Sequence, residues 1–207
     1  LNREYFNDTD REGARKQLGI PENALVLSFR SDKSHFKGLD YIYKALDSLG
    51  NRSDVYILSL AQKGNLEKYK SSFKIIEYGW LNDDTLLANI YKASDLFLMP
   101  SAAESFGMMA IESMSCGTPV LTIDGTALRD VVCADECGVS TVRDADEYAR
   151  EFARLANNKS ELRTRGLLSS KYAQKEYSSD VYVDRIIEVY NQALDNHAKD
   201  AYASRLE

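Results

Sequence analysis

The sequence predicts an α/β fold built on a doubly wound sheet of six parallel strands, with extra helices at the C-terminal end. Short β-rich apolar runs alternate with amphipathic helical patterns from Ala24 to about Asn157. Several runs are apolar on both faces, as in parallel strands that helices cover on both sides. Alternating strands and helices form βαβ units with right-handed crossovers. Six such strands fit the Rossmann-like order 3-2-1-4-5-6.

The strands are predicted from runs of residues that favour extended structure, each bounded by polar or turn-forming residues. In chain order they are Leu25–Arg30, Val55–Leu60, Lys74–Tyr78, Asp95–Met99, Pro119–Ile123 and Val139–Val142.

The helices are predicted from apolar residues at spacings of three and four. The first places Leu39, Ile42 and Leu46 on one face, and the second has Asn82 as its expected N-cap. Between the strands, helices are predicted over Gly38–Leu49, Asp83–Ala93, Phe106–Ser115 and Ala127–Val132. After Asp144 only helices follow, over Asp146–Asn157, Ser160–Tyr177 and Asp180 to about Ala201.

Composition excludes several classes of protein. The chain has 207 residues and a formal net charge of −6 at pH 7. A surface that binds nucleic acid or an anionic membrane needs a basic face instead. No apolar run approaches the ~18 residues of a membrane span. Cys116, Cys133 and Cys137 are odd in number and irregularly spaced, which predicts reduced thiols in a cytosolic setting rather than a metal site.

The two ends of the chain suggest a piece of a longer protein. The sequence begins at Leu1 without an initiator Met. The pair Leu206-Glu207 is typical of the remainder of a cloning site, and we expect it to lie outside the fold. The last 25 or so residues are predicted as a long, mostly polar helix that docks on a partner or a missing domain.

The strand order predicts a ligand site beyond the C-terminal ends of strands one and four, at Arg30 and at 99–101. After Pro100 a polar loop carries Glu104, and a helix begins near Phe106 with unsatisfied N–H groups that attract anions. Gly107 allows close approach of a ligand. From Phe106 to Glu112 such a helix rises about 9 Å, so two carboxylates with a positive helix end between them would clamp a nucleotide-sugar.

A structural alternative stays open for this segment. Met108, Met109 and Ile111 form an apolar helix face that would be core in any α/β protein. Glu104 could simply complement the helix dipole. Glu112 is harder to explain this way, because a carboxylate in an apolar helix is costly without a partner.

Three further segments are weaker candidates. Arg30 and Lys37 follow the first strand and suit phosphate contact, or belong to a solvated basic loop. Trp80 follows the third strand, where it packs near a nucleobase or within a capping turn. Gly125 and Thr126 follow the fifth strand, where they contact a diphosphate or sugar, or cap a short helix. His35 lacks His or Cys neighbours and is predicted to be a loop residue.

These residues resemble the signature of the retaining GT-B glycosyltransferases of family 4 (group 1). The resemblance rests on Pro-Ser-x-x-Glu-x-Phe-Gly from Pro100, a second Glu eight positions after Glu104, and Gly-x-Pro-Val from Gly117. Residues 91–99 are similar to the family's strand before that signature, and the pair Lys37-Gly38 is similar to its diphosphate-binding segment. Two departures are visible: Arg30 and Lys37 are seven apart where five is usual, and 124–130 replaces the family's Gly-Gly-x-Pro-Glu turn.

The resemblance implies a role for each candidate residue. Glu104, Arg30 and Lys37 would be catalytic: Glu104 touches the donor sugar, and the two cations neutralise the departing diphosphate without a metal ion. Glu112 would accept the ribose hydroxyls. The other implied donor-binding residues are Ser105, Phe106, Gly107, Met108, Trp80, Gly125 and Thr126.

The resemblance also implies the wider organisation. Residues 1–178 would be the nucleotide-sugar-binding domain, and 179–205 a helix that docks on a missing N-terminal acceptor domain. The substrates would be a UDP- or GDP-sugar donor and a saccharide or lipid-linked acceptor in polysaccharide or glycan biosynthesis, with no other cofactor. The full-length protein would be cytoplasmic or peripheral at the cytoplasmic face of the membrane. This piece alone would be inactive. The alternatives are a non-catalytic nucleotide-binding module and a GT-B nucleotide-sugar epimerase.

Overall fold

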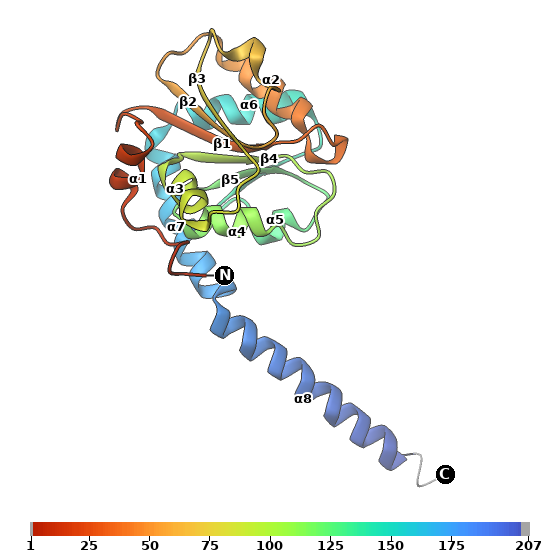
Figure 1. Cartoon of the computed structure of the whole chain (residues 1–207). Coiled ribbons are helices and arrows are strands. Elements are labelled where there is room, and N and C mark those ends of the chain that lie inside the picture. Colours follow the sequence, from red (N-terminus) through yellow and green to blue (C-terminus); the bar gives the residue numbers. More distant parts are fainter. Residues whose placement is uncertain (1, 204–207) are drawn as a thin grey trace.

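The computed structural model describes residues 2–203 and confirms the predicted sheet. Six strands, all parallel, lie in the order β3-β2-β1-β4-β5-β6 (Figure 1). They are β1 (Leu25–Ser31), β2 (Val55–Ala61), β3 (Lys74–Gly79), β4 (Leu96–Met99), β5 (Val120–Ile123) and β6 (Val139–Thr141). The winding reverses between β1 and β4, whose Phe29 and Leu98 are paired.

Helices cover both faces of the sheet, because alternate strand residues point to opposite sides. Leu96 and Leu98 of β4 belong to the core under α2 and α6, while Phe97 and Met99 belong to the core under α3, α4, α5 and α7. The helices are α1 (Arg11–Gln17), α2 (Leu39–Leu49), α3 (Asp84–Ala93), α4 (Met108–Ser115), α5 (Leu128–Val131), α6 (Ala145–Ala156), α7 (Lys159–Tyr177) and α8 (Ser179–Ala203), with short 3-10 turns η1 (His35–Lys37) and η2 (Glu67–Tyr69).

The helices of the structure differ from the sequence-based predictions at three points. Helix α1 was missed, because its short sequence has no apolar periodicity and is capped by Asp10 in a left-handed conformation. Helix α3 is capped by the Asp83 side chain, not by Asn82, which instead accepts a hydrogen bond from the Trp80 indole. Helix α4 begins at Met108 rather than at Phe106, because Gly107 has φ 81° and cannot belong to the helix.

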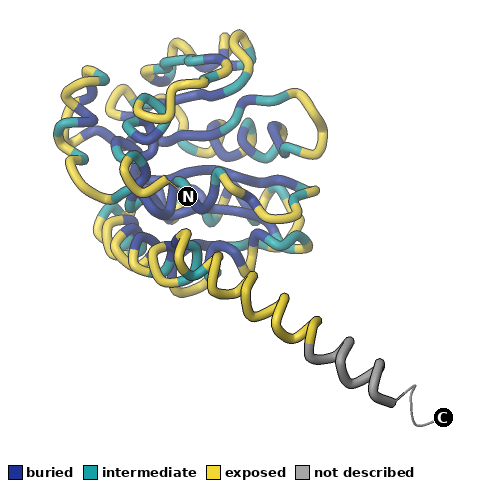
Figure 2. The backbone as a smooth tube through the Cα atoms, turned by 60° about the horizontal axis from the view of Figure 1, so that its bottom comes forward, coloured by how far each residue is buried: buried dark blue, intermediate teal, exposed yellow. Residues whose placement is uncertain are grey.

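Helix α8 extends away from the body of the molecule (Figure 1). Residues 182–194 are exposed throughout (Figure 2), and they include large apolar side chains such as Tyr182, Ile187 and Leu194. The described surface of the helix, residues 182–194, therefore carries apolar side chains as well as polar ones. Within residues 2–203, no helix is both long and apolar enough to cross a membrane. Leu206 and Glu207, the expected cloning remainder, lie outside the described residues.

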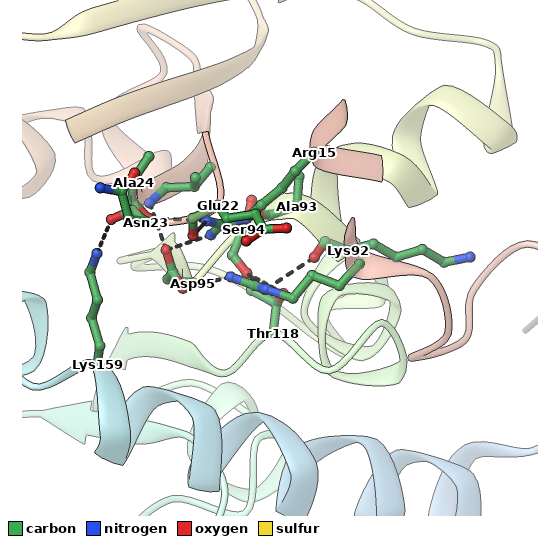
Figure 3. A network of polar contacts seen from close by, with 12 residues as sticks. Arg15, Glu22, Asn23, Ala24, Lys92, Ala93, Ser94, Asp95, Thr118 and Lys159 are labelled. Carbon is green, nitrogen blue, oxygen red and sulfur yellow. Dashed lines mark hydrogen bonds and ion pairs between the residues drawn. The ribbon is translucent and has the colours of Figure 1, made fainter. Parts of the chain in front are cut away.

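A buried ion-pair network ties α1 to the amino end of the sheet (Figure 3). Asp95, just before β4, accepts hydrogen bonds from Arg15 at 2.9 Å and from the Val26 amide of β1 at 2.8 Å. Arg11 donates to its other oxygen at 2.6 Å. Arg15 is only 3% exposed, and its other N–H groups donate to backbone carbonyls, including that of Ala93 at 3.0 Å. Every charge in the network is thus paired, as burial requires.

Replacing Asp95 with Asn is expected to lower the free energy of unfolding by about 3 kcal/mol, because the Arg15 charge would stay buried without its counter-ion. Urea denaturation measures this loss. The matched control is Asp54→Asn, which breaks the solvent-exposed pair with Arg52 and should cost less than about 1 kcal/mol. Equal effects of the two substitutions would contradict the structural role of Asp95.

Candidate functional site

A cavity of about 270 Å³ opens beyond the C-terminal ends of β1 and β4, where the winding of the sheet reverses. Its walls come from the end of β1, the turn η1, the end of β4 and the start of α4. They are Arg30, Lys37, Phe97, Leu98, Met99, Ser101, Glu104, Ser105, Phe106, Gly107, Met108 and Met109. The structure therefore brings together candidate residues that are far apart in the sequence.

Gly38 sets the distance between the two halves of this cavity. Its φ is 68°, and a Cβ there would lie 2.0 Å from the carbonyl oxygen of Pro100. Next to it, the amide of Ala102 donates to the carbonyl of Phe36 at 2.8 Å. The loop after β4 is thus held against η1, and any side chain at position 38 would force the two apart.

Both cations of the cavity face carboxylates. The Lys37 Nζ lies 3.0 Å from Glu104 Oε2. Arg30 donates through Nε and Nη2 to Asp32 Oδ2, at 3.1 and 2.8 Å. The amide of Ser34 and the Arg30 guanidinium lower the pKa of Asp32. An anionic ligand would enter a site whose positive charges are balanced by side chains able to rotate aside.

The N-terminus of α4 adds unsatisfied donors to the cavity. Gly107 precedes the helix in a left-handed conformation, and a Cβ there would lie 2.5 Å from Leu128. Within residues 2–203, the amides of Met108 and Met109 have no hydrogen-bond acceptor. These N–H groups and the helix dipole favour an anion at this point.

A second cavity of about 250 Å³ adjoins the first and shares Arg30 and Met109 with it. It lies under the turn after β3, and its walls are mostly apolar. They are Arg30, Leu60, Ala61, Gly79, Trp80, Leu81, Leu87, Met109 and Glu112. Trp80 is 70% exposed, and its ring lies 5.8 Å from the Arg30 guanidinium carbon.

Glu112 is the acidic side chain in the wall of this second cavity. Burial raises its pKa to about 7, and the nearby charge of Asp84 adds to the rise. The hydroxyl of Tyr91, 3.4 Å from Glu112 Oε2, acts in the opposite direction. A carboxylate with a raised pKa that faces a cavity is a common property of functional sites.

The model of the family described as Glycosyl transferases group 1 matches residues 10–176. The chain belongs to this family. A D-inositol 3-phosphate glycosyltransferase of Saccharomonospora viridis is 29% identical over 212 residues, 92% of this chain and 48% of the relative. The chain therefore spans about half the length of the curated relatives it matches.

Solved structures of glycosyltransferases share the fold. Sucrose-phosphate synthase of Thermosynechococcus elongatus matches with a TM-score of 0.78 at 22% identity, over 95% of this chain and 51% of that one. HepE of Anabaena, solved with UDP and glucose, matches with a TM-score of 0.74 at 19% identity, over 93% and 55%. The sheet of this group 1 chain is the Rossmann-like sheet of the GT-B fold.

Two of the predicted donor-binding residues of this group 1 glycosyl transferase do not line either cavity. The carbonyl of Gly125 accepts a hydrogen bond from Arg143 at 2.7 Å. The hydroxyl of Thr126 accepts a hydrogen bond from the amide of Leu128, the first residue of α5, at 3.2 Å. The three cysteines are free, as predicted, and His35 packs on Phe36 outside the cavity walls.

Sequence reasoning missed two features near the site. Arg143, just after β6, donates to the carbonyls of Ala102, Asp124 and Gly125 and so links the loops after β4 and β5. The sequence offered one signal for this role, because Arg143 directly follows the predicted strand 139–142. Ala61, in the wall of the second cavity, has φ 75°, a strained conformation for a residue with a side chain. No sequence signal marked this position.

The raised pKa of Glu112 predicts a pH-dependent cost to stability. The unfolded chain ionises this carboxyl near the ordinary value of 4.5 and the folded chain near 7, so the folded state holds the extra proton between these values. Stability should fall as pH rises from 4.5 to 7, by on the order of 2 kcal/mol. Urea denaturation of the native protein and of Glu112→Gln at pH 5 and pH 8 measures this. Parallel pH profiles for the two proteins would contradict it.

Proposed function

We propose that this chain is the donor-binding half of a retaining glycosyltransferase of family 4, which moves a sugar from a nucleoside-diphosphate sugar to a saccharide or lipid-linked acceptor. One observation carries the proposal. Two adjoining cavities at the switch point of the sheet combine two cations, a helix N-terminus and a half-buried carboxylate. That arrangement matches the chemistry of a sugar, a diphosphate and a nucleoside placed end to end.

The first cavity is suited to the diphosphate and the sugar. Lys37, Arg30 and the free amides at the start of α4 would stabilise the negative charge that develops on the leaving diphosphate. Glu104, which pairs with Lys37 in the free protein, would turn to the sugar hydroxyls once phosphate takes up the lysine. Because side chains and helix amides supply this charge stabilisation, the proposed transfer does not require a metal ion.

The second cavity is suited to the nucleoside. Glu112 would accept hydrogen bonds from the ribose hydroxyls, and the apolar walls with Trp80 would receive the base. From Met108 to Glu112 the helix rises about 6 Å, shorter than a helix starting at Phe106 would give. The phosphate would therefore lie closer to Glu112 than the sequence suggested.

The comparisons support this assignment at the level of the family. HepE was solved with UDP and glucose, and the curated relatives bear the name of a sugar-transferring enzyme. Since this chain spans about half of such relatives, we propose that the acceptor site lies on another domain and that this part alone transfers nothing. The whole protein would act in glycan synthesis in the cytoplasm or at the inner face of the membrane.

Titration calorimetry with UDP and GDP tests the donor site. We expect one of the two to bind this chain below the millimolar range, and Glu112→Ala to weaken it at least tenfold, since hydrogen bonds to a charged group are lost. Glu188→Ala on the exposed helix α8 is the control and should leave the affinity unchanged. Absence of binding to either nucleotide would count against the proposal.

The diphosphate contact is tested by Lys37→Gln. We expect UDP affinity to fall about five- to tenfold and UMP affinity to fall less, because the lysine is placed for the distal phosphate. The matched control is Lys33→Gln, in the same loop but exposed, with less than a twofold effect. Equal losses for UDP and UMP would contradict the assignment of Lys37.

The two alternative functions separate in the complete protein. Transfer from a UDP- or GDP-sugar to an acceptor supports the proposal. Isomerisation of a UDP-sugar without acceptor would indicate an epimerase, and nucleotide binding without either reaction would indicate a binding module.

A further inference from the structure

Tyr91 is a buried tyrosine of α3 that touches the candidate site from behind. The residue is 0% exposed, and its hydroxyl donates to Glu112 Oε2 at 3.4 Å. In the described part of the chain this is the one hydrogen bond of that hydroxyl. A buried hydroxyl needs such a partner. This hydrogen bond therefore joins the side chain of Tyr91 on α3 to that of Glu112 on α4.

The ring of Tyr91 is held on several sides. Phe97 of β4 packs edge-to-face against it at 5.3 Å, and Phe6 lies at 6.4 Å. The carbonyl of Tyr91 accepts a hydrogen bond from the Thr118 hydroxyl at 2.6 Å. Because backbone and ring are both fixed, the hydroxyl is a fixed donor that does not adjust to the ligand.

Glu112 is less constrained than its partner. It lies on the wall of the second cavity and is half-buried, and its side chain has three rotatable bonds. A free carboxylate of this kind would sample several rotamers and lose that freedom when it binds a ligand. The hydrogen bond from Tyr91 occupies one oxygen of Glu112 and leaves the other for a ligand in the cavity that Glu112 lines.

We infer that Tyr91 is a positioning residue: its hydroxyl holds one oxygen of Glu112 so that the carboxylate is set to receive the vicinal hydroxyls of a ribose. The inference rests on the proposed function, because it assigns a nucleotide ribose to Glu112. Tyr91 does not touch the nucleotide itself. Its hydrogen bond also favours the ionised carboxylate, against the effect of burial on the pKa of Glu112.

Tyr91→Phe tests the inference, because it removes one oxygen and keeps the ring. Affinities for UDP and for 2′,3′-dideoxy-UDP are measured by calorimetry at pH 8. We expect UDP to bind about three- to tenfold more weakly, while binding of the dideoxy nucleotide changes less than twofold, since it has no hydroxyls for Glu112. A loss of equal size for both nucleotides, or no loss for UDP, would overturn the inference.

Tyr148→Phe is the matched control. Tyr148 is also 0% exposed, and its hydroxyl donates to the backbone carbonyl of Leu121 at 3.2 Å, in the core under α2 and α6. Thermal melting of both variants checks the fold, and UDP affinity should be unchanged in Tyr148→Phe. An equal loss of UDP affinity in the control would overturn the specific role of Tyr91.

A double variant gives a second measure. In a Glu112→Gln background, Tyr91→Phe should weaken UDP binding by less than twofold, because the carboxylate it positions is already gone. A further full loss there would overturn the inference while leaving the donor site intact. Failure of the native protein to bind UDP or GDP would instead overturn the proposed function, and this inference with it.

Discussion

The pairing of β1 with β4 is the constraint on which the candidate site depends. At the amino end it is fixed by Asp95, whose backbone amide donates to the Val26 carbonyl and whose side chain accepts from the Val26 amide. At the carboxyl end, Gly38 fits against Pro100 with no room for a Cβ. Both ends of one strand pair are thus specified, and the loops that follow these strands must meet.

Charge is distributed between the two ends of the sheet in different ways. At the amino end the arginines are fully committed to Asp95 and to backbone carbonyls, which makes the network structural. At the carboxyl end Lys37 and Arg30 each pair with one half-buried carboxylate, Glu104 and Asp32 respectively. Arginine thus stabilises the fold at the amino end of the sheet, whereas at the carboxyl end Lys37 and Arg30 line the first cavity.

Helix α4 links the two cavities because its first turn faces one and its second turn faces the other. Gly107 allows the helix to start abruptly at Met108, which frees amides for the first cavity. One turn later Glu112 enters the second cavity with Tyr91 behind it. The short helix thus holds a donor group and an acceptor group at a fixed separation.

The sequence by itself determined the sheet order, because the strand–helix alternation is a local pattern. It also named most of the residues that line the two cavities at the switch point, because the segment from Pro100 to Val120 is local too. It misplaced the start of α4, since the backbone conformation at Gly107 is not visible in composition. It also grouped Gly125 and Thr126 with residues whose cavities they do not line. Only the tertiary structure decided the contacts of Gly38 with Pro100, of Arg15 with Asp95 and of Tyr91 with Glu112. Each joins residues on different elements, whose meeting depends on packing rather than on local pattern.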